Sequence, residues 1–180
     1  HVTVFQLAAS FRGYLLVMAQ AVSTIFVKEM YDANVSSDSN KQVNEVFQKT
    51  SKYIITIVFF AIGGFVACGR DFVVSWIGVE KENVFYLALI ILIVWSVPLG
   101  FLPANDARRA KNKHMISSYV LLGTALLNIV ISIFFVKIFP NEDAVWACIM
   151  GTTISVVLGR WIVLPITDYK YVNLDIKRFY

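Results

Sequence analysis

The sequence has few residues of the kinds that bind metals or form disulfides. Its 180 residues include two Cys and two His, and neither Cys68 nor Cys148 stands in a Cys-x-x-Cys or Cys/His spacing. Both cysteines lie in apolar surroundings, where we expect them to pack; a disulfide or a metal site is the alternative. We therefore expect no bound metal and no cofactor.

Charged residues are also scarce. Asp, Glu, Lys and Arg make up 16% of the chain and hydrophobic residues 58%, whereas soluble domains have about 25% charged and about 45–50% apolar residues. With a mean hydropathy of +0.67, these values exclude an ordinary soluble domain. The net charge of +4 does not indicate nucleic-acid binding, because the basic residues lie beside the ends of apolar runs and form no patch interleaved with aromatic residues.

Catalytic motifs are missing as well. The sequence contains no nucleophile elbow, P-loop, His-Glu-x-x-His or paired-carboxylate motif. The connection at about residues 70–83 is too short for a folded catalytic domain. We therefore expect that this chain is not an enzyme and has no catalytic residues.

Long apolar runs dominate what is present. A bilayer core of roughly 30 Å is crossed by a helix of about 20 apolar residues, and five runs are long enough or nearly so: residues 3–27, 53–69, 84–104, 115–138 and 144–166. We predict an all-α, polytopic membrane protein in which residues 1–180 form a single unit of five transmembrane helices.

The basic residues indicate how these helices are oriented, because short cytoplasmic loops retain Lys and Arg. The connections at 28–52 and 105–114 and the tail at 167–180 hold Lys28, Lys41, Lys49, Lys52, Arg108, Arg109, Lys111, Lys113, Lys170, Lys177 and Arg178. The other side holds only Arg70, Lys81 and Lys137. This bias predicts a multi-pass protein of the cytoplasmic (inner) membrane with its N-terminus outside and its C-terminus in the cytoplasm.

The cytoplasmic segments have distinct expected structures. The polar stretch Asp32 to Asn40 is expected to be a loop. Ser39 and Gln42 then form a capping-box pattern, which predicts a helix that lies in the membrane interface and leads into the second span. The tail at 167–180 alternates aromatic and charged residues, as an interfacial segment does.

A narrow polar stripe runs along the first helix. Its members share one face and comprise Gln6, Ser10, Gly13, Gln20 and Thr24. Small and amide residues on one face of a membrane helix favour close packing and interhelical hydrogen bonds, and they also occur on the walls of water-filled cavities. The stripe is therefore either a packing seam or a cavity wall.

Two basic residues lie inside the apolar runs rather than beside them. Arg160 is about six residues, roughly 9 Å, from the expected end of its span, so it can either extend to the headgroups or line a cavity. Arg12 is about 22 Å from the cytoplasmic end and lies near mid-membrane. No acidic residue lies in the interior of the five runs, so a guanidinium at this depth requires a partner elsewhere or an anionic substrate.

Several passages, taken in order, resemble the polysaccharide flippases, the O-antigen and capsule exporters of the multidrug/oligosaccharidyl-lipid/polysaccharide superfamily. The similar passages are Gly69-Arg-Asp-Phe-Val-Val-Ser-Trp-Ile-Gly78, Lys111-Asn-Lys-His114 followed by Leu126-Leu-Asn128-Ile, Gly151-Thr-Thr-Ile-Ser155, and Tyr169-Lys-Tyr171 through Leu174-Asp-Ile-Lys-Arg-Phe179. One passage departs from the family: Pro140 to Trp146 replaces its usual glycine-rich turn. Each motif is loose, and the specificity lies in their order and spacing.

The resemblance implies that this chain is most of the C-terminal lobe of a two-lobed transporter, and a start at His1 without an initiator Met also favours an internal piece of a longer chain. The implied partners are membrane lipids, the missing N-terminal lobe and a lipid pyrophosphate-linked oligosaccharide substrate. Arg12 and Arg160 are the implied substrate-binding residues, with Gln6, Gln20 and Asn128 as further candidates for the cavity wall.

Three functions remain open from the sequence. The resemblance favours a flippase that moves a lipid-linked oligosaccharide for surface polysaccharide biosynthesis, such as lipopolysaccharide O-antigen. A drug or cation exporter of the same superfamily would have an acidic rather than a basic cavity. A membrane-embedded polysaccharide polymerase or ligase would need a large outer loop with catalytic residues.

Overall fold

A computed structural model describes residues 2–36, 38–78, 82–138 and 144–175. This part of the chain is helical and contains no strand. Its elements in chain order are α1 (Val2–Val35), α2 (Ser39–Ile77), α3 (Asn83–Gly100), α4 (Leu102–Ala110), α5 (His114–Ile138), α6 (Ala144–Val156), the π-helix η2 (Val157–Val163), α7 (Leu164–Thr167) and the π-helix η3 (Asp168–Val172).

Five helical stretches in the described residues are long and apolar enough to cross a membrane. They are Phe5–Val35, Ser39–Ile77, Asn83–Ala110, His114–Ile138 and Trp146–Val172. Large apolar side chains are exposed along them, and α5 has no buried residue at all. An apolar helix surface of this kind is suited to lipid rather than water. The expected all-α architecture with five helices long and apolar enough to span a membrane is therefore confirmed.

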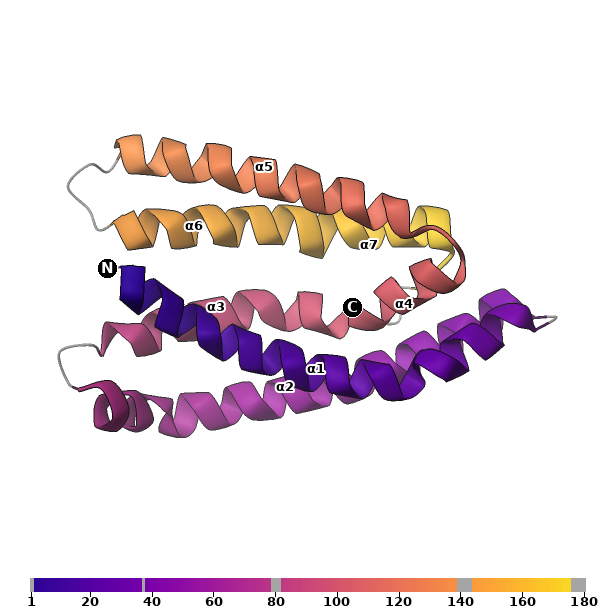
Figure 1. Ribbon diagram of the computed structural model, residues 1–180, viewed down its shortest axis with the longest axis horizontal. Helices are drawn as coiled ribbons and strands as arrows, with labels where there is room; N and C mark the ends of the chain where they lie inside the picture. The colour runs from indigo at the N-terminus through magenta and orange to yellow at the C-terminus, as the bar shows by residue number, and fades with distance from the viewer. Residues whose placement is uncertain (1, 37, 79–81, 139–143, 176–180) are drawn as a thin grey trace.

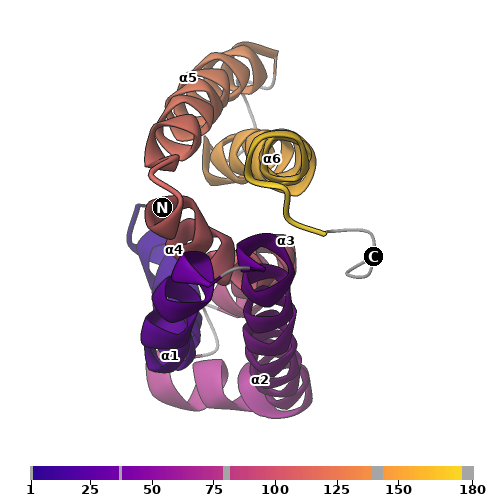
Figure 2. The same cartoon turned by 90° about the vertical axis from the view of Figure 1, so that its right-hand side faces the viewer.

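The helices form two groups, and α3 and α4 connect them. α1, α2 and α3 pack against each other, and α5 packs antiparallel to α6 (Figure 1). The second view shows the α5–α6 hairpin set apart from α1 and α2 (Figure 2). α3 joins the groups, because it contacts α1 and α2 on one side and α6 and η2 on the other.

The expected loop at Asp32–Asn40 is instead mostly helical, whereas the helix predicted to begin at Ser39 and lead into the second span is confirmed. α1 runs to Val35 and α2 begins at Ser39, so the two helices extend together beyond α4 (Figure 1). At 1.5 Å per residue, their 34 and 39 residues give lengths of about 51 and 58 Å. The polar composition of Asp32 to Asn40 was outweighed by tertiary packing, because Met30 and Ala33 of α1 are buried in the same cluster as Val43, Val46 and Phe47 of α2.

The other two basic segments are also more structured than expected. Most of the connection at 105–114 is occupied by α4, which leaves residues 111–113 between helices. The last helix continues past residue 166 to Val172, and Val172 and Leu174 are buried in the core cluster at this end of the molecule. The described part of the tail, up to residue 175, is thus docked on the helices, and its remaining residues lie outside the described ones.

Small residues hold the α5–α6 hairpin together. Gly151, Ser155 and Gly159 are buried at every fourth position of the last span. A Cβ atom on Gly151 would collide with Ser132 of α5, and one on Gly159 would collide with Thr124. Close backbone approach at small residues is the main way in which membrane helices associate, since lipid provides no hydrophobic driving force between them.

Candidate functional site

A pocket lies where α1, α3 and α6 meet. Its volume is about 140 Å³, and it is lined by Phe5, Ala9, Arg12, Ile91, Val94, Trp95, Ile149, Thr152 and Thr153. At about 30 Å³ for each water molecule, it has room for four or five waters or a small anionic group. Most of the wall is apolar, and the polar groups come from one arginine, two threonines and an indole.

Packing near the pocket explains why these helices converge. Ala8 of α1, Val84 and Ile91 of α3 and Ile149 of α6 are buried in one apolar cluster. Ala8 is completely buried, and a side chain this small lets α1 approach α3 closely. Arg12 follows one helical turn later, so it is brought to the level of Trp95.

Two arginines from different spans lie over the same indole. The Cζ atoms of Arg12 and Arg160 are each 4.5 Å from the centroid of Trp95. The two guanidiniums are therefore no more than twice this distance, 9 Å, apart. An indole attracts cations through its π-electrons, which stabilises each arginine by about 0.5–2 kcal/mol. Trp95 thus holds two like charges close together.

Neither guanidinium has an anionic partner within the described residues. The ion pairs found there are Lys49–Glu29, Arg70–Glu82 and Arg108–Asp168. The Nε atom of Arg12 is buried without a hydrogen-bond partner. Because a guanidinium is a planar fork of donors that fits carboxylates and phosphates, this arrangement is suited to binding an anion.

The cluster lies near the middle of the spans. Trp95 is 12 residues from the start and 15 from the end of Asn83–Ala110, and Arg160 is 14 residues from the start and 12 from the end of Trp146–Val172. The expected distance of Arg160 from its helix end, about six residues, was therefore too short. The helix continues because Asp168, which suggested an interfacial tail, is buried in an ion pair with Arg108.

Only two of the five predicted cavity residues come together: Arg12 and Arg160 both contact Trp95, and of the two only Arg12 lines the pocket. Gln6 and Gln20 are exposed, and their backbone carbonyls accept hydrogen bonds from Ser10 Oγ at 2.9 Å and Thr24 Oγ1 at 2.8 Å. The polar stripe of α1 is thus largely exposed and does not form a packing seam with the described helices. Asn128 lies on α5, where its Oδ1 accepts a hydrogen bond from Ser132 Oγ at 3.0 Å, and it does not line the pocket.

Three residues of the pocket lining were not predicted as site residues from the sequence: Trp95, Thr152 and Thr153. Tryptophan in membrane proteins is enriched at the two interfaces, whereas Trp95 lies near the centre of an apolar run. Its unusual depth was the available signal. The two threonines carry no comparable signal, because hydroxyl residues are common wherever membrane helices pack.

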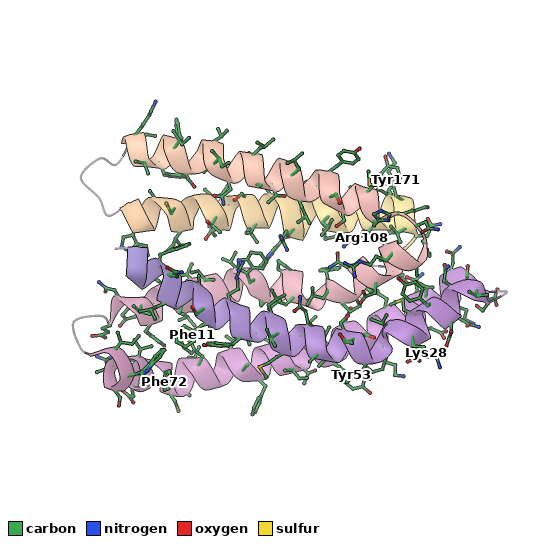
Figure 3. The ribbon with its side chains drawn as sticks, in the orientation of Figure 1. Phe11, Lys28, Tyr53, Phe72, Arg108 and Tyr171 are labelled. Carbon is green, nitrogen blue, oxygen red and sulfur yellow. The ribbon has the colours of Figure 1, made fainter. Side chains whose placement is uncertain are left out.

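A second polar cluster lies at the end of the molecule that carries the basic segments. Arg108 Nη1 donates to both carboxylate oxygens of Asp168, at 2.6 and 2.8 Å, and both side chains are 1% exposed. Arg108 Nη2 also donates to Asn105. Figure 3 shows Arg108 at the same end as Lys28 and Tyr171, opposite to Phe72. The cluster joins α4 to the last span.

Lys111 extends the cluster toward α2. Its Nζ donates to Asn40 Oδ1 at 2.8 Å and to the carbonyl of Val172 at 2.7 Å. Burial, and then the neighbouring charge of Lys113, lower the pKa of Lys111. Lys113 Nζ donates to the carbonyl of Tyr171. These bonds place α2, α4 and the end of the last span in one connected network.

Comparisons of this chain with protein-family models, with curated proteins and with solved structures found no match.

Proposed function

We propose that this chain is part of a membrane transporter that moves a lipid pyrophosphate-linked oligosaccharide across the cytoplasmic membrane. In this proposal Arg12 and Arg160 hold the pyrophosphate while the sugar passes through a wider, water-filled cavity. The single observation that supports it best is the pair of guanidiniums stacked on Trp95 without a carboxylate partner among the described residues.

Electrostatics favours an anionic ligand. Two unit charges no more than 9 Å apart repel each other by at least about 0.5 kcal/mol in water and at least about 2 kcal/mol at an effective dielectric constant of 20. An anion that contacts both guanidiniums adds two attractions, which outweigh this repulsion. The size of the pocket, about 140 Å³, suits the anionic group of such a substrate and not its oligosaccharide.

The charge of the pocket also argues against a cation exporter. Such a transporter needs an acidic group to attract its substrate, and the pocket lining in the described residues contains Arg12 and no Asp or Glu. The proposal further takes the chain as one lobe of a transporter of the multidrug/oligosaccharidyl-lipid/polysaccharide superfamily, supported by the order of the sequence passages above. The basic end, with Lys28 and Arg108, would face the cytoplasm.

The test uses the full-length protein in nanodiscs and in a strain lacking its own copy. Arg12→Ala and Arg160→Ala each remove charge-assisted hydrogen bonds worth about 1.5–3 kcal/mol, so each should weaken inorganic pyrophosphate binding by about 10- to 100-fold and reduce export of surface polysaccharide. Arg12→Lys tests whether charge without the planar fork is sufficient.

Arg109→Ala is the matched control, because Arg109 is exposed and remote from Trp95 in the chain. It should bind pyrophosphate like the wild type. If Arg12→Ala and Arg160→Ala also bind and export like the wild type, the two arginines are structural and the proposal is wrong.

A further inference from the structure

One hydrogen bond between the spans depends on a proline. Trp161 Nε1 of η2 donates to the backbone carbonyl of Val94 in α3 at 2.9 Å. In a regular α-helix this carbonyl would accept from the residue four positions later, which is Pro98, and proline has no N–H. A membrane interior offers little water to satisfy a carbonyl released in this way, so a neighbouring helix supplies the donor.

The same bond lies directly beside the arginine cluster. Trp161 follows Arg160 in η2, and Val94 precedes Trp95 in α3. The hydrogen bond joins Trp161 to Val94, and the cation–π contact joins Arg160 to Trp95. The two contacts therefore involve neighbouring residues in both helices. A shift of one span along the other would break both contacts together.

The backbone of η2 is a second reason why the Trp161 hydrogen bond matters for the position of Arg160. Arg160 and Trp161 lie in a π-helix, Val157–Val163, within a span that is otherwise largely α-helical. An inserted π-helical stretch changes the direction in which the following side chains project, and such stretches are frequent at functional sites. The hydrogen bond from Trp161 to α3 fixes the rotation of η2 about its axis, and therefore the direction in which Arg160 projects.

We propose that Pro98 and Trp161 are positioning residues for the anion site: Pro98 leaves the Val94 carbonyl free, and Trp161 binds it, which sets Arg160 over Trp95. The inference rests on the proposed function where it concerns anion affinity. The registration of η2 on α3 is a property of the fold and is measured separately.

Two substitutions test the Trp161–Val94 hydrogen bond, one by removing its donor and the other by giving its acceptor a different partner. Trp161→Phe removes the indole donor and keeps an aromatic ring of similar shape. Pro98→Ala restores an N–H four residues after Val94, which gives that carbonyl a partner within α3 and removes the need for Trp161. Because both changes break the same interaction, their effects should not add in the double variant.

The experiment measures two quantities in the full-length protein in nanodiscs. The first is the affinity for inorganic pyrophosphate by titration calorimetry. The second is the distance distribution between spin labels at Ile93→Cys and Ile162→Cys, two exposed positions beside the bond, with Cys68 and Cys148 replaced by Ser. Trp146→Phe, at a partly exposed tryptophan of α6, is the matched control.

We expect Trp161→Phe and Pro98→Ala each to broaden the distance distribution and weaken pyrophosphate binding about threefold to tenfold, the range for one buried hydrogen bond. The double variant should lose no more than the stronger single variant, and Trp146→Phe should match the wild type. Unchanged distances in both single variants, or losses that multiply in the double variant, would overturn the proposal.

The two hypotheses fail in different ways. If the wild type does not bind pyrophosphate, the proposed function is wrong, and the spin-label distances still decide whether Pro98 and Trp161 set the register. If the wild type binds and Trp161→Phe changes neither quantity, the positioning role is wrong while the anion site stands.

Discussion

Removing the carboxylate of Asp168 should destabilise the protein more than any other single change of charge at the basic end. Asp168 and Arg108 are both 1% exposed, and the carboxylate accepts two hydrogen bonds from one guanidinium nitrogen. In Asp168→Ala the Arg108 charge stays buried with Asn105 as its only remaining described side-chain partner. An uncompensated charge of this kind costs about 3–5 kcal/mol.

A surface pair in the same chain provides the comparison. Lys49 and Glu29 are separated by 3.4 Å, and their side chains are 50% and 49% exposed. Solvent screens such a pair, so Glu29→Ala should cost about 0–1 kcal/mol. Each variant removes one carboxylate from one ion pair, so the difference between them reports the combined effect of burial and of the two short hydrogen bonds to Asp168.

Thermal unfolding in nanodiscs is a suitable assay. At roughly 2–4 °C per kcal/mol, the scale for folded units of about 150–250 residues, Asp168→Ala should lower the midpoint by roughly 6–20 °C, and Glu29→Ala by no more than about 4 °C. Replacing both partners, as in Arg108→Met with Asp168→Leu, should recover most of the loss, since an apolar pair of similar volume avoids the buried charge.

Two results would refute this reasoning. Equal shifts for Asp168→Ala and Glu29→Ala would mean that the pair is not buried in the folded protein. A double variant less stable than Asp168→Ala would mean that Arg108 contributes through contacts other than the carboxylate.

Three further predictions concern packing and backbone. Gly159→Leu should cost about 1–3 kcal/mol of stability by overpacking against Thr124. Gly123→Leu is the control and should not destabilise the fold, because no atom lies within 4 Å of its Cβ position. Equal shifts of the two melting temperatures would contradict the close approach of α5 and α6. Trp95→Leu should lower stability by about 1–2 kcal/mol more than Trp76→Leu, since only Trp95 supports two arginines, and the comparison fails if both shift alike. Asn173 has φ 57° and ψ 40°, so Asn173→Val should cost about 1–2 kcal/mol while Asn173→Gly stays near the wild type; chemical unfolding would contradict this if the two variants are equally stable.

Much of the architecture follows from composition alone. A helix satisfies every backbone group internally, so an apolar run of about 20 residues can hardly be anything else in a membrane. The five runs therefore determine five helices, and their lengths require consecutive connections to lie at opposite ends. Arg12 could also be selected from the sequence, because a charge inside an apolar run is costly without a function or a partner.

The sequence alone could not determine which polar residues meet. Asp32 to Asn40 has loop composition, yet packing of Met30 and Ala33 against α2 extends both helices through most of it. Asp168 belongs to the segment predicted as an interfacial tail, and its ion pair with Arg108, 60 residues away in the chain, keeps it buried. Such pairings depend on long-range contacts, which local composition does not encode.

The arginine cluster shows the same division. The sequence pattern placed Arg12 and Arg160 in separate runs, only the family resemblance implied that they share a cavity, and Trp95 was not predicted as a site residue. Tertiary structure brings all three together, because the apolar cluster around Ala8, Ile91 and Ile149 joins α1, α3 and α6 at that level. The long apolar runs thus determined that these helices exist. The contacts between the helices determined that Arg12 and Arg160 both lie over Trp95.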